Sequence, residues 1–202
     1  RDDVESRGLG DVYKRQLLRL LYSTGMRIGE ACSLINSDVD MSSRIILVRN
    51  TKNKRDRQLP ISDSLYQVLE QYLIKRDKLP LHNMGNPNSP FLISLDGSSL
   101  TGVSARHWFY KILEASDIDY IPKVGPRIHD LRHTFAVHVL DKLVKEGVDM
   151  HCCLPVLSMA LGHKCVSDTE YYVRITNQVY PHLSDTTSAI SEYVFPTIST
   201  MK

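Results

Sequence analysis

The sequence lacks the features that mark several classes of protein. Its 202 residues include only four cysteines, Cys32, Cys152, Cys153 and Cys165, whose spacing argues against a disulfide framework and for reduced thiols. It contains no apolar run long enough to span a membrane, no signal peptide and no internal repeat. The formal net charge is only +2, which permits a polyanionic partner without indicating one. We therefore expect a soluble, cytoplasmic protein with one well-buried domain.

The chain divides into three parts by composition. Residues 1–16 are polar and lack helical or strand periodicity, so we interpret them as a leader that is poorly ordered or not native to the domain. Residues 17–180 carry the periodic apolar patterns and form the predicted domain. Residues 181–202 are a tail with one weakly amphipathic piece.

The first half of the domain predicts helices around one small sheet. Apolar residues at helical spacing on both sides of Thr24-Gly25 predict two short helices joined by a tight turn. Three strands, a helix from Ser62 and a further helix follow from the later patterns. The predicted segments are strands at 44–50 and 58–61 joined by a polar loop, a surface loop at 80–90, a strand at 91–94 and a helix at 101–117.

The second half predicts three more helices. The segment "IHDLRHTFAVHVL" begins a helix that runs to Glu146, with a buried face formed by Leu131, Phe135, Val139 and Leu143. A short helix at 154–162 ends at a glycine, and Ser167 with Glu170 has the spacing of a capping box. The predicted fold class is mainly α with a small antiparallel β-sheet (α+β).

The cluster at the start of the 128–140 segment has three interpretations. His129 and His133 are four residues apart and could bind one metal ion, but Asp130 stands where the helical zinc motif has Glu, and the nearby "HCC" at 151–153 is a poor ligand set. His129 and Arg132 are three residues apart and could bind one phosphate. The third interpretation is structural, with His129 and Asp130 as capping or surface residues.

Phosphate chemistry requires further groups, and the chain offers candidates. Arg27 opens a helix directly after a glycine turn and could supply a second guanidinium group. The segment "TEYYVR" offers two tyrosines, Tyr171 and Tyr172, as nucleophiles. Lys52, in the polar loop "TKNKRDR", could protonate a leaving oxygen. Each of these residues alone is weak support.

Four motifs in order carry a family resemblance over about residues 17–175. The segments "STGMRIGEACSL", "TKNKRDRQLPIS", "HDLRHTFAVHVL" and "LGHKCVSDTEYYVRI" resemble the catalytic domain of the tyrosine recombinases, the phage-integrase family. The family's catalytic positions fall on Arg27, Lys52, His129, Arg132, His163 and Tyr172. Tyr172 is preferred over Tyr171 because of its spacing from Thr169, and Lys54 is the alternative lysine. Glu30 and His133 would be supporting residues.

The resemblance implies a metal-free and cofactor-free enzyme that breaks and rejoins duplex DNA through a 3′-phosphotyrosine. The family's fold is the catalytic-domain fold, and its members act as a tetramer of protomers on paired DNA sites. We do not expect these 202 residues to include the helical DNA-clamp domain that usually precedes this domain, so we expect weak DNA binding and a monomer without DNA. The tail at 181–202 resembles a protomer-exchange segment. Among the tasks of this family, integration of a mobile element is favoured. The alternatives are strand relaxation like that of a type IB topoisomerase, or a DNA-binding module without activity.

Overall fold

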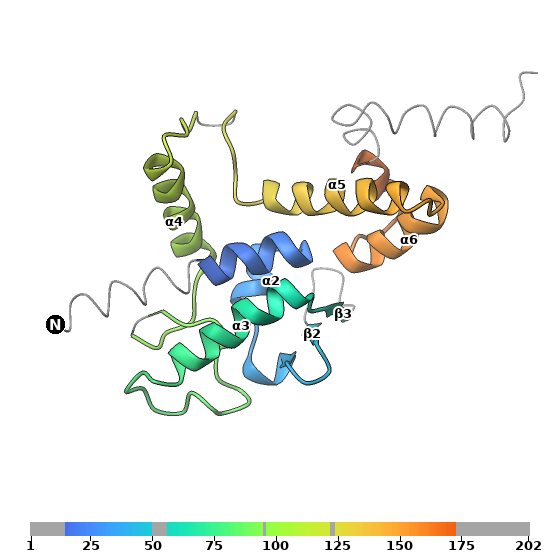
Figure 1. Ribbon diagram of the computed structural model, residues 1–202. Coiled ribbons are helices and arrows are strands. Elements are labelled where there is room, and N and C mark those ends of the chain that lie inside the picture. The colour runs from blue at the N-terminus through green and yellow to red at the C-terminus, as the bar shows by residue number, and fades with distance from the viewer. Residues whose placement is uncertain (1–14, 50–55, 95, 122–123, 173–202) are drawn as a thin grey trace, which may run out of the picture. The chain divides into compact units, whose positions relative to one another are not determined.

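The computed structural model describes residues 15–49, 56–94, 96–121 and 124–172 (Figure 1). These residues fall into two units. The first reaches to Phe135 and includes Ala160–Gly162, and the second holds Ala136–Met159 and the residues from His163 onward. Helices predominate and one small antiparallel sheet is present, which confirms the predicted fold class.

The first described helix, residues 15–24, and helix α2 (Ile28–Cys32) flank a tight turn, as predicted. Gly25 in this turn donates its backbone N–H to the carbonyl of Leu21 at 3.0 Å and has a φ angle of 64°. A Cβ atom on Gly25 would lie 2.3 Å from Cδ1 of Phe135. The left-handed backbone and this close approach both require glycine, and the turn places Arg27 at the N-terminus of α2.

The sheet has the strand order β1-β2-β3, and each pair is antiparallel. Its strands are β1 (Val39–Asp40), β2 (Ile45–Val48) and β3 (Arg57–Pro60), with a 3-10 turn η1 (Asn36–Asp38) before them. Ile46 pairs with Leu59 and Val48 with Arg57. Ile46, Val48 and Leu59 are buried, as period-two alternation requires. The predicted strands are confirmed, whereas β1 was missed because two residues carry no periodicity.

Two capped helices pack around the buried hydrophobic side chains of the first unit. Helix α3 (Asp63–Arg76) begins after Ser62, whose hydroxyl accepts the backbone N–H of Leu65 at 3.3 Å. Helix α4 (Gly102–Ala115) begins after Thr101, which caps it through the N–H of Ser104 at 3.1 Å. Both helices confirm the sequence prediction.

The predicted strand at 91–94 is wrong. Among the described residues this segment makes one isolated bridge, Ile93 with Ser99, and the preceding Pro90 makes another with Ile35. Its apolar side chains are buried, but side-chain and loop groups take up its backbone hydrogen bonds: the hydroxyl of Tyr72 donates to the carbonyl of Phe91 at 2.9 Å and accepts the N–H of Ile93 at 3.1 Å. A buried apolar run therefore resembled a strand without pairing as one.

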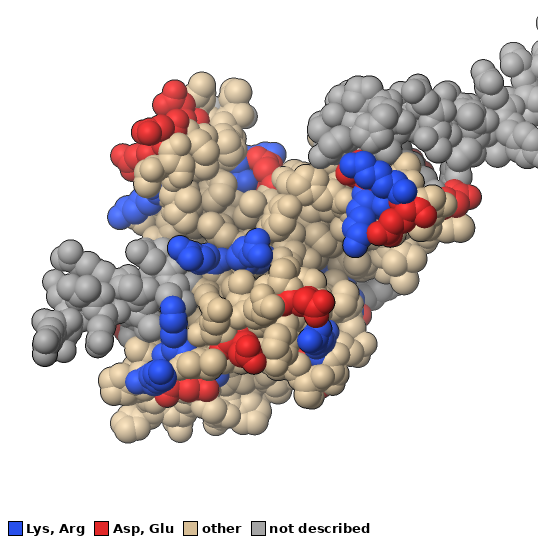
Figure 2. Space-filling view, viewed as in Figure 1, with Lys and Arg blue, Asp and Glu red and all other residues tan. Residues whose placement is uncertain are grey.

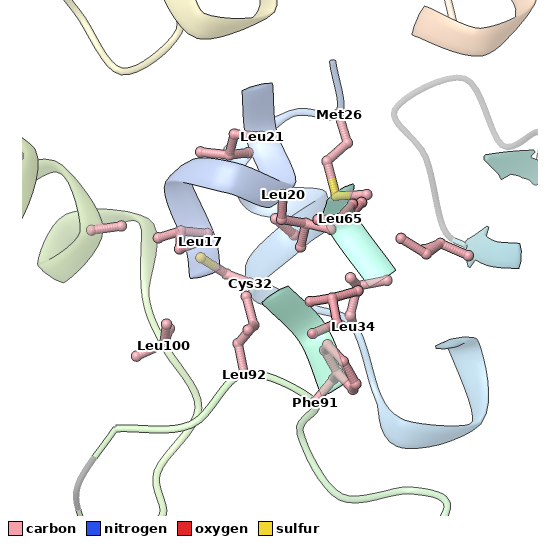
Figure 3. Close-up of a cluster of buried hydrophobic side chains, with 14 of the residues drawn as sticks. Leu17, Leu20, Leu21, Met26, Cys32, Leu34, Leu65, Phe91, Leu92 and Leu100 are labelled. Atoms are coloured by element: carbon pink, nitrogen blue, oxygen red, sulfur yellow. The ribbon is translucent and has the colours of Figure 1, made fainter. Parts of the chain in front are cut away.

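The main cluster of buried hydrophobic side chains lies within the first unit. Figure 3 shows side chains from residues 15–24, from α2 and α3 and from the 91–100 segment turned toward one another. Leu20, Ala31, Ile46, Leu65 and Leu69 are fully inaccessible to solvent. This core holds the turn that carries Arg27 against the sheet that carries Arg57.

Helices α5 (Asp130–Lys145) and α6 (Met150–Leu161) depart from the prediction in detail. The expected buried face of α5 is only partly buried, and the buried positions are instead Arg132, Ala136, Val137 and Leu140. Helix α6 starts earlier than residue 154 and accommodates Pro155 in its interior, and Gly162 ends it with a φ angle of 67°. Arg132 therefore occupies a core-facing position that the apolar pattern could not reveal.

A last helical stretch spans residues 167–172. Ser167 is its first helical residue rather than its cap, and the hydroxyl of Ser167 lies 3.0 Å from Sγ of Cys165, so the predicted capping box is wrong. Within the described part of the chain, no helix combines the length and the apolar character needed to cross a membrane.

Candidate active site

Arg27 caps the N-terminus of α2 and is tied to Glu30. The backbone N–H of Arg27 donates to Oε2 of Glu30 at 2.8 Å, and its Nη1 donates to Oε1 at 3.0 Å. Nη2 of Arg27 reaches the carbonyl of Gly162 at 3.3 Å, across 135 positions of sequence. The Arg27 side chain is 29% exposed, so part of its guanidinium group faces solvent.

Glu30 is shared with a second guanidinium group, that of Arg57. Nη1 and Nη2 of Arg57 donate to the two carboxylate oxygens of Glu30 at 3.2 and 2.7 Å, and Nε donates to the carbonyl of Ala160 at 2.7 Å. Burial alone would raise the pKa of Glu30, but the hydrogen bonds from Arg57 and Arg27 outweigh it and lower the pKa. Glu30 is therefore a buried carboxylate that stays charged.

Arg132 is almost fully buried, at 3% exposure. Its Nη1 donates to the carbonyl of Gly25 at 2.8 Å, and its Nη2 donates to the carbonyl of Leu161 at 2.7 Å. These two carbonyls belong to the turn before Arg27 and to the end of α6. Arg27, which follows this turn, and Arg132 thus both donate to carbonyls of residues 161–162, and Arg132 also holds the turn at Gly25.

The two histidines of the cluster are close neighbours. The rings of His129 and His133 are 5.1 Å apart in an edge-to-face arrangement. His129 lies directly before α5 and is largely exposed, yet partial desolvation, followed by the nearby His133 and Arg132, lowers its pKa. Desolvation also lowers the pKa of His133. Both rings therefore favour the neutral form at neutral pH.

The carboxylate of Asp130 is engaged by Arg127. Its carboxylate accepts the backbone N–H of Arg127 at 2.8 Å and Nη2 of Arg127 at 3.0 Å, so it caps the start of α5. No group of three or more potential ligands that could hold a metal ion exists among the residues placed by the structure. The geometry favours the phosphate interpretation over the metal one.

An open pocket of about 400 Å³ lies beside Arg27. It is lined by Arg27, Ile28, Gly29, Glu30, Ser33, Arg49 and His129. Arg49 is 46% exposed and its Nε donates to Oδ1 of the buried Asp38 at 2.5 Å. The pocket therefore combines two guanidinium groups and an imidazole, a set of donors that suits an anion.

His163 and Tyr172 lie together in the second unit. Nδ1 of His163 is 2.8 Å from Oγ1 of the buried Thr169, and the His163 and Tyr172 rings are nearly parallel, 6.0 Å apart. Tyr172 is 3% exposed, whereas its neighbour Tyr171 is 57% exposed. The structure thus places Tyr172, and not Tyr171, against the candidate histidine.

A family model described as the phage integrase family matches residues 4–178. The chain belongs to the phage integrase family. It is 32% identical over 162 residues to tyrosine recombinase XerC of Thermodesulfovibrio yellowstonii, an alignment that covers 80% of this chain and 50% of that protein. This integrase-family chain spans about half the length of the curated relatives it matches.

Solved structures support the fold of this integrase-family chain. The crystal structure of XerA recombinase matches with a TM-score of 0.64 at 24% identity, covering 87% of this chain and 61% of that one. XerH site-specific recombinase bound to its difH substrate matches with a TM-score of 0.62 at 24% identity, covering 80% and 42%. The catalytic-domain fold expected from the motifs is confirmed.

The predicted site residues of this integrase family member fall into three groups. The first unit brings together Arg27, Glu30, His129, Arg132 and His133. The second unit brings together His163 and Tyr172. Lys52 and its alternative Lys54 lie outside the described residues, as do residues 1–14 of the predicted leader and the tail at 181–202.

Two basic residues of the site were not predicted, Arg57 and Arg49. Arg57 had a usable signal, because period-two alternation in the strand puts it on the same face as the buried Leu59. Arg49 follows the buried Val48 and had no such signal. Contacts with Glu30 and Asp38, respectively, are what bring them to the site.

Proposed function

We propose that this integrase-family chain is the catalytic part of a site-specific DNA recombinase that works through a 3′-phosphotyrosine intermediate. The observation that carries the proposal is the convergence of Arg27 and Arg132 on the carbonyls of residues 161–162, although the two residues are far apart in sequence. Two guanidinium groups at one place match the negative charge that a phosphodiester gathers in its five-coordinate state. Family membership supports the same chemistry.

In the proposed reaction, Oη of Tyr172 attacks a backbone phosphate of duplex DNA. A bond forms between Tyr172 and phosphorus, and the bond from phosphorus to the 5′ oxygen breaks. Arg27 and Arg132 stabilise the charge on the non-bridging oxygens, and His163 donates a hydrogen bond to one of them. Attack by a 5′-hydroxyl group of another strand reverses the step, so the bond energy is retained.

The proton transfers fall to His129 and Lys52. The lowered pKa of His129 supports a role as the base that accepts the phenol proton of Tyr172. Lys52 supplies the proton to the departing 5′ oxygen. The mechanism requires Tyr172 to reach the phosphate that Arg27 holds, and no metal ion or cofactor takes part in it.

The proposed partner is double-stranded DNA, on which four protomers assemble at two paired sites. Crystal structures of relatives with the same fold contain DNA, among them XerH bound to difH. We assign the protein to a cytoplasmic, mobile-element integrase, and expect this chain alone to be monomeric without DNA. The tail at 181–202 is the proposed protomer-exchange segment.

The test is covalent trapping on a DNA duplex that carries a nick beside the cleavage position, so that the cleaved fragment diffuses away. The wild-type chain should form a protein–DNA adduct in excess EDTA, and Tyr172→Phe should form none. Tyr171→Phe is the matched control and should keep the wild-type yield, because that side chain is exposed. An adduct that persists in Tyr172→Phe but vanishes in Tyr171→Phe would overturn the assignment of the nucleophile.

Two other outcomes separate the alternatives. Relaxation of supercoiled DNA without exchange between paired sites would indicate a topoisomerase-like activity. DNA binding without any adduct would indicate a module that lacks activity.

A further inference from the structure

We infer that Arg57 is a positioning residue for the proposed cleavage: through Glu30 it holds the guanidinium group of Arg27 in place to meet the scissile phosphate. The inference rests on the proposed function and adds a residue to it. Arg57 itself would touch neither the DNA nor the reacting atoms.

Arg27 and Arg57 share the carboxylate of Glu30. A carboxylate offers about four acceptor positions, and Glu30 uses them on two donors from Arg27 and two from Arg57. Each oxygen therefore serves both arginines. Moving the Arg57 end of this network shifts the carboxylate and hence the position of Arg27.

Arg57 is more deeply buried than Arg27. Arg57 and Glu30 are 9% and 8% exposed, whereas Arg27 is 29% exposed. An anion bound in the neighbouring pocket would contact Arg27, which lines it. Arg57 does not line this pocket, whereas Glu30 does. Two guanidinium groups and one carboxylate leave one positive charge unbalanced, which a phosphate at Arg27 can neutralise.

The backbone at residues 160–162 accepts hydrogen bonds from both arginines. Arg57 donates to the carbonyl of Ala160 and Arg27 to the carbonyl of Gly162, so the same short segment supports both arginines. A Cβ atom on Gly162 would lie 2.9 Å from Nη1 of Arg57. A side chain at this place would therefore displace the Arg57 guanidinium group, and the left-handed φ angle of residue 162 also favours glycine.

The test compares two DNA linkages in the trapping assay. One carries the natural phosphate at the cleavage position, and the other carries a neutral methylphosphonate, which has no charge for Arg27 to neutralise. The readout is the ratio of the adduct-formation rates on the two linkages. A residue that only supports the fold lowers both rates equally and leaves this ratio unchanged.

Arg57→Lys keeps the charge but loses the fork that spans both oxygens of Glu30. We expect it to lower the rate on phosphate by about 10-fold or more and to lower the rate on methylphosphonate much less, so that the ratio moves toward that of Arg27→Lys. Arg57→Met and Gly162→Ala should move the ratio in the same direction. The double variant Arg27→Lys/Arg57→Lys should lose less than the product of the two single effects.

Arg76→Lys is the matched control. Arg76 is also buried, at 5% exposure, and also donates to a backbone carbonyl, that of Phe91, but it does not line the pocket. Arg76→Lys should lower the melting temperature and leave the linkage ratio at the wild-type value. If Arg57→Met fails to fold, Arg57→Lys carries the test.

The outcomes separate the inference from the proposed function. A wild-type chain that reacts, together with Arg57 variants whose ratio equals that of wild type, overturns the role of Arg57 alone. A wild-type chain that forms no adduct on either linkage overturns the proposed function, and the inference with it.

Discussion

At the scale of the residue, the arginines of this site are held by backbone carbonyls as well as by carboxylates. Arg27, Arg57 and Arg132 each donate to at least one carbonyl of residues 25 or 160–162. The guanidinium group has five N–H donors in a fixed planar fork, so it can hold a carbonyl and present a further pair of donors, whereas the lysine ammonium group has three donors on one nitrogen atom. These arginines are therefore parts of the fold and not only charges on its surface.

Some of these roles could be read from the sequence, and others could not. Arg27 and Arg132 stand in motifs whose order and spacing are specific, so both could be named. Strand alternation could place Arg57 on the buried face of β3, but its role could not be read, because that role depends on the contact between β3 and α2 through Glu30, which is a product of tertiary packing. Sequence spacing carries no information on which carboxylate two distant arginines will share.

The pH dependence of the proposed cleavage should report the protonation of the His129 imidazole. Its pKa lies below the ordinary value of 6.5, so the ring is neutral at neutral pH, as the proposed role of proton acceptor requires. As the pH falls through this lowered pKa, the ring becomes protonated and the rate of adduct formation should fall. Trapping rates from about pH 8 to about pH 5 measure this acidic limb.

His129→Gln should abolish the acidic limb and leave a low rate that does not depend on pH in this range. His107→Gln, in α4 and away from the pocket beside Arg27, is the control and should retain the limb. An unchanged limb in His129→Gln would assign the proton acceptor to another group.

At the scale of the element, periodicity predicted the existence of helices better than their faces. Helix α5 was expected to bury Leu131 and Phe135, but its buried positions include Arg132 and Ala136. The expected face is partly buried, and the fully buried positions beside it include a charged residue that two backbone carbonyls satisfy.

The turn between the first two helices offers a matched pair of glycine substitutions. Gly25→Ala should lower the free energy of unfolding by at least about 2 kcal/mol, because the left-handed φ angle and the approach to Phe135 both oppose a Cβ atom. Gly29→Ala, in α2 with nothing within 4 Å of its Cβ position, should be neutral or stabilising by about 0.5 kcal/mol. Urea unfolding measures both, and equal losses would contradict the role of the Gly25 turn.

At the scale of the whole molecule, positive and negative charges nearly balance, with 25 Lys and Arg residues against 23 Asp and Glu residues. On the face drawn in Figure 2, the coloured Lys and Arg side chains form several separate groups, and acidic side chains lie among them. The formal net charge of the full sequence is +2. Phosphate contacts supply most of the affinity of a protein for DNA, so a chain of this charge should bind DNA weakly and with strong dependence on salt.

We expect Arg49 to make a measurable contribution to the salt dependence of DNA binding. Arg49 lines the pocket beside Arg27, so we expect it to contact a phosphate near the scissile one. Arg49→Gln should then reduce the slope of log K against log salt concentration by about 1. Arg44→Gln is the control: Arg44 is 49% exposed against 46% for Arg49, but it pairs with Asp63 outside the pocket and should leave the slope unchanged.

Fluorescence anisotropy with a labelled duplex at several salt concentrations measures both slopes, and a dissociation constant in the micromolar range or weaker is expected for the wild-type chain alone. Equal slopes for wild type and Arg49→Gln would remove Arg49 from the DNA contact. A band shift by nanomolar protein at moderate salt would contradict the weak affinity itself. Such binding would require phosphate contacts beyond those that Arg27, Arg49 and Arg132 can supply, because each neutralised phosphate adds only a limited increment of affinity at that salt concentration.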